Sequence, residues 1–462
     1  MLLWILPHIA FILGFLLAAL VIADVLRQRL SPAGTSAWLL VIVLLPYVGV
    51  PLYLMLGGRK MRQIAQSKPE ILLPKGATRP LKEASTVDRL LRSYHIPGAT
   101  NGNRVSLCRT GEESYAALVD LIDQATRSLS LSTFILGKGA VGQDIIDRLA
   151  RRAAEGINVR VLLDGVGSLR TTRRFLAPLI QAGGQVAFFM PLIHRPFRGR
   201  TNLRNHRKIV IADEQRVMAG GVNIAAEYIG PTPTPGRWRD LAFVMEGPAV
   251  IQYMTIFRSD WQFATREDLP INPDHAKPIT DNNDEAVVQI VPSGPDVEGD
   301  PLYAALLSAV FSAKRRLWII TPYFVPNDAL SNALAIAAHR GVDVRVLVPK
   351  VSNHRIADLA RGTYLRELQT AGGTVMLYTP GMVHAKVLIM DEELSVIGSA
   401  NMDHRSLFLN YEAAMIVYSR PVIEATASWF SELAADARIG IKEVGTVRDV
   451  FEGVVRIAAP LL

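Results

Sequence analysis

One polar pattern occurs twice in the sequence, H-x-K-x4-D-x6-G-x2-N. The first copy consists of His206, Lys208, Asp213, Gly220 and Asn223, and the second consists of His384, Lys386, Asp391, Gly398 and Asn401. An apolar stretch follows each lysine, which indicates a strand on which the histidine and the lysine, two residues apart, point to the same face. A lone H-x-K is a weak signal, but two copies with the same internal spacing are a strong one.

The residue types in this pattern fit an exchange reaction at a phosphodiester. One imidazole can attack phosphorus and form a covalent phosphohistidine, which divides a difficult step into two easier ones. The other imidazole can protonate the leaving alkoxide and then deprotonate the incoming alcohol. Ammonium and amide groups would stabilise the charge on the non-bridging oxygens, and the candidates are Lys208, Lys386, Asn223 and Asn401. We therefore expect one shared site that needs no metal ion and no cofactor.

The elements that must position the two motifs are also repeated. Tyr115–Leu118 recurs as Tyr303–Leu306, Val159–Leu162 recurs as Val344–Leu347, and Ala182–Gly184 recurs as Ala371–Gly373. Because the copies keep their order while their offset drifts by a few residues, we infer a duplicated unit with insertions in its loops. Strands alternate with helical stretches, as in α/β proteins. The predicted fold is therefore α/β, with two similar units packed face to face as a pseudo-dimer around one site.

A basic insertion distinguishes the first unit from the second. The offset falls from 189 residues at the Ala-Gly-Gly copies to 178 at the histidines, so the first unit carries 11 extra residues before His206. The stretch contains Arg195, Phe197, Arg198, Arg200 and Arg204. It is either a solvated loop or an arm that touches lipid headgroups or gates the site, and the sequence leaves both interpretations open.

Two apolar runs without charged residues, Met1–Ala23 and Ala37–Leu56, open the sequence. Each has the roughly 20 residues that a helix needs to cross a bilayer, and no basic residue precedes the first run, unlike in a signal peptide. We predict a membrane hairpin of two transmembrane helices, while Pro46 and Pro51 leave a re-entrant hairpin open. The expected regions are the hairpin (1–59), an irregular linker (60–103), the first unit (104–267) and the second unit (286–462).

The charged residues indicate how the chain is oriented in the membrane and what kind of partner it binds. Arg59, Lys60 and Arg62 follow the second apolar run and favour a cytoplasmic position for the two units, whereas Arg27 and Arg29 favour the opposite. The formal net charge of +8 indicates an anionic partner, either a phospholipid surface or nucleic acid. The single cysteine, Cys108, excludes an internal disulfide and a multi-cysteine zinc site.

The paired motif resembles the signature of the phospholipase D superfamily, and the sequence is most similar to the bacterial cardiolipin synthases. The stretches that carry this resemblance are Asn205–Lys208, Gly220–Asn223, Trp238–Asp240, Val291–Asp296, Thr321–Pro326, Gly398–Asp403 and Pro460–Leu462. The resemblance implies that two phosphatidylglycerols react to give cardiolipin and glycerol through a phosphatidyl-histidine. It also implies a multi-pass protein of the bacterial cytoplasmic membrane that binds anionic phospholipid and not nucleic acid.

The resemblance further implies roles for individual residues. His206 is expected to be the nucleophile and His384 the acid and base, although the symmetry of the motifs allows the reverse. An acid about 30 positions after each histidine is expected to orient that ring, which assigns Asp240 to His206 and Glu412 to His384. The motif aspartates, Asp213 and Asp391, are expected to hold a turn rather than to react. Ser399 stands where the first motif has Gly221, and its hydroxyl is a candidate ligand for the phosphate.

The same sequence features are compatible with several other functions. Water in place of the second lipid would make the protein a phospholipase D, or a membrane-tethered phosphodiesterase or nuclease, and only a dry pocket favours transfer. A non-catalytic scaffold that binds anionic lipid is a third possibility, which the two intact motifs disfavour. A metal site from His206, His384 and His404 lacks the usual ligand spacing. The G-x-G-x-x-G of Gly137–Gly142 matches a dinucleotide-binding turn, but its counterpart Pro322–Asp328 has no glycines.

Overall fold

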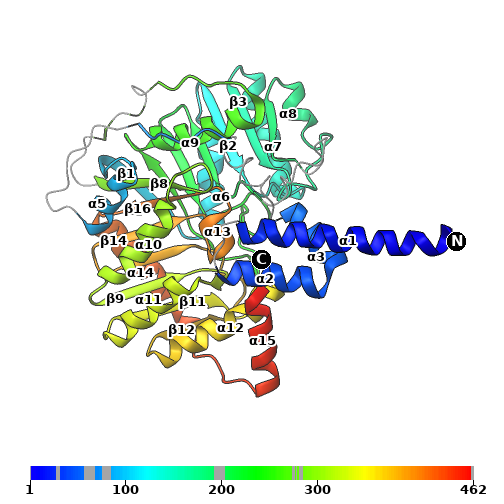
Figure 1. The fold of residues 1–462 in the computed structure, drawn as a ribbon. Helices are drawn as coiled ribbons and strands as arrows, with labels where there is room; N and C mark the ends of the chain where they lie inside the picture. Colours follow the sequence, from blue (N-terminus) through cyan, green and yellow to red (C-terminus); the bar gives the residue numbers. More distant parts are fainter. Residues whose placement is uncertain are drawn as a thin grey trace.

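The computed structural model describes residues 2–27, 32–56, 68–74, 85–191, 203–272, 276, 278–279 and 285–458. Arg195, Phe197, Arg198 and Arg200 of the insertion, the charged residues at positions 29 and 59–62, and the C-terminal Pro460–Leu462 stretch lie outside the described residues. Fifteen of the described strands form one sheet with helices on its faces (Figure 1). The predicted α/β class is therefore confirmed.

The two units repeat one strand order outward from a common junction. In the first unit the order is β1 (Thr100–Cys108), β7 (Ala242–Glu246), β6 (Arg216–Gly220), β5 (Ile209–Ala212), β2 (Ser128–Thr133), β3 (Asn158–Asp164) and β4 (Gln185–Phe189). In the second it is β8 (Ala286–Ser293), β16 (Glu412–Val417), β14 (Leu394–Gly398), β13 (Val387–Met390), β9 (Arg316–Ile320), β11 (Asp343–Pro349), β12 (Thr374–Tyr378) and the extra edge strand β17 (Ala437–Ile439). The matching orders confirm the duplication.

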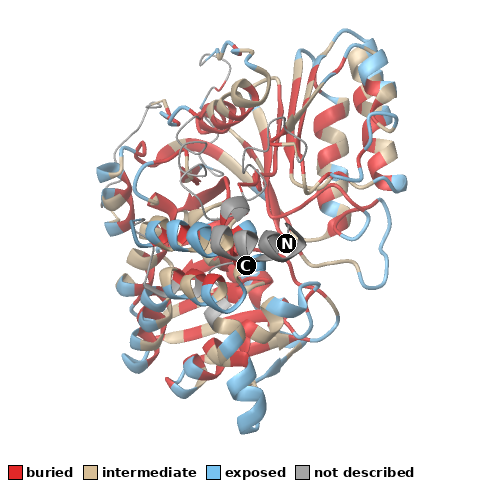
Figure 2. Cartoon of the chain, turned by 45° about the vertical axis from the view of Figure 1, so that its right-hand side comes forward, coloured by how far each residue is buried: buried red, intermediate tan, exposed pale blue. Residues whose placement is uncertain are grey.

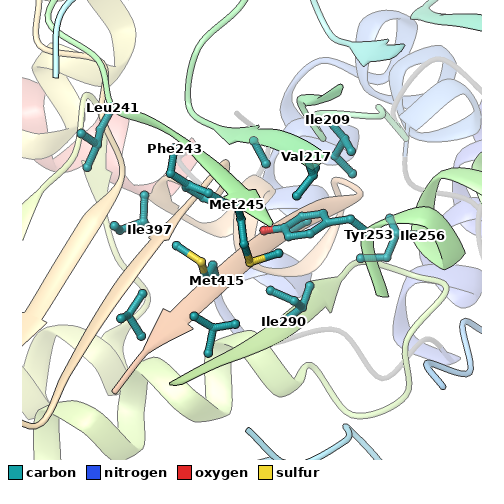
Figure 3. Packing of buried hydrophobic residues seen from close by; sticks show 14 of the residues in the cluster. Ile209, Val217, Leu241, Phe243, Met245, Tyr253, Ile256, Ile290, Ile397 and Met415 are labelled. Atoms are coloured by element: carbon teal, nitrogen blue, oxygen red, sulfur yellow. The ribbon is translucent and has the colours of Figure 1, made fainter. Parts of the chain in front are cut away.

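The units meet edge to edge, because β1 pairs antiparallel with β8 and closes both free edges. The expected face-to-face packing is therefore wrong for the sheets themselves. A shared core reinforces the junction: Phe243 and Met245 of the first unit contact Ile290 and Met415 of the second (Figure 3). Tyr253, which is fully buried, lies in the same cluster. This continuous core fixes the two motifs relative to each other.

Helices cover both faces of the sheet. Those of the first unit are α6 (Gly111–Asp123), α7 (Ala140–Ala154), α8 (Ala177–Gln181) and α9 (Val250–Thr265). Those of the second are α10 (Pro301–Ser312), α11 (Asp328–His339), α12 (Arg355–Thr370), α13 (His404–Phe408), α14 (Arg420–Ala435) and α15 (Thr446–Ala458). A short parallel pair, β10 (Phe324–Val325) and β15 (Met402–Asp403), lies beside the main sheet. Figure 2 shows that the strands are mostly buried and the helices half exposed.

The N-terminal region forms α1 (Leu2–Arg27), α2 (Pro32–Leu44) and α3 (Pro46–Leu56). The second apolar run is divided just before Pro46, which suits the first position of a new helix because proline has no N–H to donate. The helices pack through Val25, Ile42 and Tyr53, and the Tyr53 hydroxyl donates to Asp24 Oδ2 at 2.7 Å. Among the described residues, none of the helices meets the combined length and apolarity that a membrane crossing requires.

The segment expected to be an irregular linker contains ordered structure. Helix α5 (Thr86–Ser93) begins at an N-cap, where the Ser85 side chain accepts from the Val87 N–H. Val87 and Leu91, one helical turn apart, are buried against α10 in the core of the second unit. The prediction of an irregular linker is therefore wrong for this part, because two apolar residues with helical spacing were enough to fix a short helix.

Candidate active site

The two motif histidines lie at the junction, each just before a strand that its own unit contributes. His206 precedes β5, and its N–H donates to the Tyr411 carbonyl of the second unit at 2.9 Å. His384 precedes β13, and its N–H donates to the Arg239 carbonyl of the first unit at 2.7 Å. Each histidine is thus hydrogen-bonded to the opposite unit, and both side chains are almost fully buried.

The acids that hold the imidazoles are exchanged between the units. Glu412 accepts from His206 Nδ1, with its two oxygens at 2.9 and 3.0 Å, and Asp240 accepts from His384 Nδ1 at 2.6 Å. The expected assignment of each acid to the histidine of its own unit is therefore wrong. The backbone explains why: Tyr411 pairs with the segment of His206, so the next residue, Glu412, faces that ring.

The crossed acids fix the tautomer of each ring. A carboxylate accepts hydrogen bonds only, so each Nδ1 carries the proton and each Nε2 keeps its lone pair. The carbonyl of Ser399 also accepts from His206 Nδ1, at 3.1 Å. Phe134 packs edge-on against the ring of His206, with centroids 4.9 Å apart, and Tyr228 does the same for His384 at 5.0 Å. Both rings are therefore fixed in position by partners at Nδ1 and by an aromatic neighbour.

The motif lysines lie beside the histidines. Lys208 Nζ donates to the His206 carbonyl at 2.7 Å, and Lys386 Nζ lies 2.8 Å from His384 Nδ1 and 3.2 Å from its Nε2. Burial lowers the pKa of both lysines, that of Lys386 to about 8, against the opposing effect of the nearby carboxylates. In their charged forms these two buried lysines would favour an anion in the site.

The same environment favours the neutral form of the histidines. Burial lowers the pKa of His206 and lowers that of His384 to about 3, with Lys386 adding to the effect on His384. Burial alone would raise the pKa of Asp240, but Lys386 and His384 outweigh it and hold the pKa below its ordinary value. The site therefore combines neutral imidazoles and ionised acids with two lysines whose pKa values are lowered by burial.

The amides and the serine of the motifs have protein partners. Asn223 Oδ1 accepts from the Ile135 N–H at 3.1 Å, and Asn401 Nδ2 donates to Ser406 Oγ at 3.1 Å. The buried Oδ1 of Asn401 has no hydrogen-bond partner in the described structure. The Ser399 hydroxyl is held by the backbone of Ala413, whose N–H donates to it at 3.1 Å. Ser399 is thus bonded to the strand that carries Glu412, and its predicted contact with phosphate stays a prediction.

The difference between Gly221 and Ser399 follows from the space beside the acid of the same unit. A Cβ at position 221 would collide with Oδ1 of Asp240. In the second unit the residue corresponding to Asp240 is Glu412, and a serine fits beside its strand. The glycine is therefore required by close approach to the acid that orients His384.

The motif aspartates lie at the far ends of β5 and β13. Asp213 accepts from the backbone N–H groups of Thr126, Arg127 and Ser128 at 2.6 to 2.9 Å. Asp391 does the same for Lys314, Arg315 and Arg316, at 2.8 to 3.0 Å. Both therefore hold turns, as expected, and have no direct contact with the histidines.

A cavity of about 320 Å³ opens onto His206. Its lining is mostly from the second unit and includes Tyr323, His354, Asn401, Asp403, His404, Arg405 and Asn410, with Phe134 and Arg204 from the first. Four of these side chains carry or can take positive charge, which suits an anionic headgroup. No motif in the sequence indicated a role for His354 or Arg405. The topology brings them together because α12 and α13 begin at the same end of the sheet.

A buried ion network lies beneath His206. Arg207 contacts Asp260 Oδ1 at 2.7 Å and Asp296 Oδ1 at 3.0 Å, and Lys68 Nζ lies 2.5 Å from Asp296 and 3.0 Å from Asp260. All four side chains are fully buried, and their formal charges cancel. Arg207 also donates to the carbonyl of Glu412 at 3.0 Å. The network therefore connects both units and the acid that holds His206.

Replacing Lys68 with methionine is expected to destabilise the folded protein by about 3–5 kcal/mol, because it leaves two buried carboxylates to share one arginine. The midpoint of thermal unfolding of the purified protein would measure this. Glu424→Gln, which removes a partner from the exposed pair Arg420–Glu424, serves as the control and should leave the midpoint unchanged. A midpoint for Lys68→Met equal to that of the wild type would contradict the prediction.

Little in the sequence pointed to this network. Lys68 lies in the segment expected to be a linker, and Arg207 is the variable residue of the motif. Asp296 lies in one of the stretches that carry the family resemblance, but its role there was not inferred. Asp260 is on α9, and only its burial in the folded chain distinguishes it from a surface acid.

Comparisons with known proteins bear on this site. A family model described as "Cardiolipin synthase, PLD-like domain" matches residues 118–261 and 306–434, and one described as "Phospholipase_D-nuclease N-terminal" matches 16–58. The major cardiolipin synthase of Bacillus subtilis is 32% identical, covering 99% of each chain. The cardiolipin synthase of Halalkalibacterium halodurans is 34% identical, over 94% of this chain and 90% of its own. The crystal structure of phosphatidylserine synthase from Haemophilus influenzae covers 82% of this chain and 100% of its own, with a TM-score of 0.61 at 14% identity, which bears on the fold alone.

Proposed function

The chain belongs to the cardiolipin synthases of the phospholipase-D-like family, and from this premise we propose that it transfers a phosphatidyl group from one phosphatidylglycerol to another. The products are cardiolipin and glycerol. The observation that carries the proposal is the pair of buried histidines, each held by an acid of the opposite unit and accompanied by a lysine. That arrangement supplies a nucleophile, an acid and base, and a binding site for an anionic phosphate in one place.

The reaction follows from the geometry of the rings. His206 Nε2 attacks phosphorus, the bond to the glycerol oxygen breaks, and that oxygen takes a proton from His384 Nε2. A hydroxyl of a second phosphatidylglycerol then gives its proton back to His384 and attacks phosphorus, which releases His206. Lys208 and Lys386 stabilise the charge on the non-bridging oxygens.

The neutral form of His384 fits this order of steps once the charge of the substrate is included. Burial lowers the pKa of His384, and the positive charge of Lys386 lowers it further. A phosphodiester bound between the lysines adds a negative charge that offsets them and favours the imidazolium. We therefore expect His384 to gain its proton as the lipid binds.

We propose that residues 1–59 attach the protein to the bacterial cytoplasmic membrane as a hairpin of two spans, with the catalytic units on the cytoplasmic side. Large apolar side chains on the N-terminal helices support this proposal. Phe15, Leu20, Val43, Leu44 and Tyr47 are between 63 and 75% exposed. Such a surface is stable only when apolar material covers it.

The test is to incubate purified, detergent-solubilised protein with labelled phosphatidylglycerol, without nucleotide or added metal, and to separate the lipid products. Cardiolipin together with glycerol is the expected result. Phosphatidic acid alone would show that water is the acceptor and would overturn transfer in favour of hydrolysis. No turnover of the lipid would overturn the proposed substrate, and nucleic acid would then be the next phosphodiester to test.

The dependence of kcat/KM on pH should report the loss of the proton from Lys386. Its pKa in the free enzyme is lowered to about 8, so the ammonium form is present below that pH and is lost above it. We expect kcat/KM, which reports the free enzyme, to fall as pH rises through about 8. In Lys386→Arg the charge persists at high pH, so this decline should disappear from whatever activity remains. A decline that begins only in the usual range for lysine would contradict the prediction.

A further inference from the structure

The C-terminal helix α15 exposes a row of large apolar side chains to solvent, while Glu452, Val455 and Arg456 on its other side contact the protein. Val447, Val450, Phe451 and Val454 are 87, 63, 55 and 59% exposed, and their spacing places them on one side of the helix. A helix on the surface of a soluble domain has the opposite arrangement. The apolar side therefore requires a cover that the chain itself does not supply among its described residues (Figure 2).

Ion pairs hold α15 in this orientation. Glu452 is 1% exposed, and its carboxylate lies 2.6 Å from Arg366 of α12. Arg456 contacts Glu367 at 2.7 Å and lies over the ring of Tyr364. A Cβ at position 362 would collide with Glu452, so a glycine of α12 makes room for the buried acid. The inverted orientation is therefore specified by buried contacts and is not a loose arrangement of a terminal helix.

The position of α15 identifies what covers it. The helix lies beside α2 (Figure 1), whose Leu40, Val43 and Leu44 are more than half exposed. Ile439, on the edge strand that precedes α15, is 70% exposed as well. The apolar side of α15 thus continues the apolar surface of the N-terminal helices. The same stretch carries the basic residues Arg438, Lys442 and Arg448 together with the acidic residues Glu443 and Asp449.

We propose that α15 is an interfacial membrane-binding helix that lies in the headgroup region of an anionic bilayer, with its valines and Phe451 among the acyl chains. Amphipathic helices of this kind bind in the plane of the interface through apolar burial and attraction to anionic lipid. The proposal goes beyond the proposed reaction and rests on the proposed membrane attachment only for its orientation. It supplies a second attachment at the other end of the chain.

This attachment also orients the cavity. Helix α12 carries the ion-pair partners of α15 at Arg366 and Glu367, and its first turn contributes Ala357 to the cavity on the His206 side. Holding α12 at the bilayer through α15 would keep the cavity close to the lipid surface. Substrate lipids would then reach His206 without leaving an apolar environment.

Fluorescence of labelled cysteines in lipid vesicles tests the proposal. The native Cys108 is buried, and burial raises the pKa of its thiol to about 12, so it should stay unlabelled. An environment-sensitive dye is attached to Phe451→Cys on α15, to Val43→Cys on α2 and to Phe311→Cys on α10. Phe311 is the matched control, since it is a helical phenylalanine of similar exposure, 51% against 55%. Each full-length protein is reconstituted into vesicles of phosphatidylglycerol and phosphatidylethanolamine with an acyl-chain quencher.

The dye at position 451 is expected to shift to shorter wavelength and to lose about half of its emission to the quencher, while the dye at position 311 does not change. No quenching at position 451 would overturn the proposal, whether or not the dye at position 43 is quenched. Cross-linking between copies of the Phe451→Cys variant, with protection from the quencher, would show that a second copy covers the helix and would also overturn it. The same readings in the His206→Ala background do not depend on turnover, so they separate this proposal from the proposed reaction.

Activity gives an independent measure of the same surface. Val450→Asp combined with Val454→Asp is expected to lower turnover of phosphatidylglycerol in vesicles about tenfold. Turnover of a short-chain phosphatidylglycerol that is dispersed in solution should be unchanged, because neither residue touches the site. Phe311→Asp is the control and should leave both activities intact. Equal loss on both substrates would indicate a damaged fold and would overturn the interpretation.

Discussion

Replacement of His206 or His384 by alanine is expected to lower cardiolipin formation by about 10⁴-fold or more in each case. Each ring has a separate role at one phosphorus atom, so neither can replace the other. The two rings belong to different units but lie in one buried site, since each is hydrogen-bonded to the backbone of the opposite unit. Substantial turnover by either variant would contradict a single shared site.

A substrate with an activated leaving group separates the two roles. Phosphatidyl-p-nitrophenol releases nitrophenolate without needing a proton from His384. With His206 as the nucleophile, His384→Ala should release one nitrophenolate per enzyme and then stop, because no base activates the acceptor. His206→Ala should release none. The opposite pattern would show that the roles are exchanged, which the symmetry of the motifs allows.

The alanine variants need a control for folding, because removal of a ring leaves a buried carboxylate without its donor. His206→Asn and His384→Asn are suitable, since the side-chain amide can still donate to Glu412 or Asp240. These variants should be as inactive as the alanine variants while their midpoint of thermal unfolding stays close to that of the wild type. An inactive variant with a normal midpoint of thermal unfolding would show that the loss of activity comes from the missing catalytic group and not from unfolding.

Neutralising the acids is expected to have the second largest effect, and the crossed arrangement determines which step fails. Glu412→Gln should disable His206, and Asp240→Asn should disable His384. Loss of the acid in a comparable histidine–carboxylate pair lowers turnover by about 10⁴-fold, because the ring takes the wrong tautomer. We expect a loss of that order in each variant.

The activated substrate again gives the decisive reading. Glu412→Gln should abolish the release of nitrophenolate. Asp240→Asn should still release one nitrophenolate per enzyme, but the transfer from His206 to the acceptor should then fail, so the free enzyme is not regenerated. If each acid oriented the histidine of its own unit, the two variants would show the opposite results. Ser395→Ala, a buried change on β14 that does not touch either ring, serves as the control and should retain the full sequence of steps.

Local spacing carried most of what the sequence could say about the chemistry. His206 and Lys208, like His384 and Lys386, are two residues apart before a strand, and this spacing alone puts each pair on one face. The turn-holding role of Asp213 and Asp391 was also predictable, since each ends an apolar strand. The duplication followed from repeats that kept their order, and duplication of an α/β unit implied two equivalent half-sites.

These local patterns could not predict the contacts across the junction between the two units. Glu412 faces His206 because the segment of Tyr411 pairs with the segment of His206, and that pairing depends on how β1 and β8 join the units. The same holds for Lys68 and Asp260, whose charges are tolerated only because they meet Arg207 and Asp296 in a space without water. The inverted orientation of α15 also became visible only once Glu452 was buried against α12.

The sequence by itself therefore determined the reacting groups, because their relation is set within a few residues of one strand. The tertiary structure decided which acid serves which histidine, what buried charges support the nucleophile and which side of the C-terminal helix faces outward. Those properties depend on neighbours that are between 53 and 228 positions apart in the chain. No local pattern encodes such neighbours, since they are selected by the packing of the whole core.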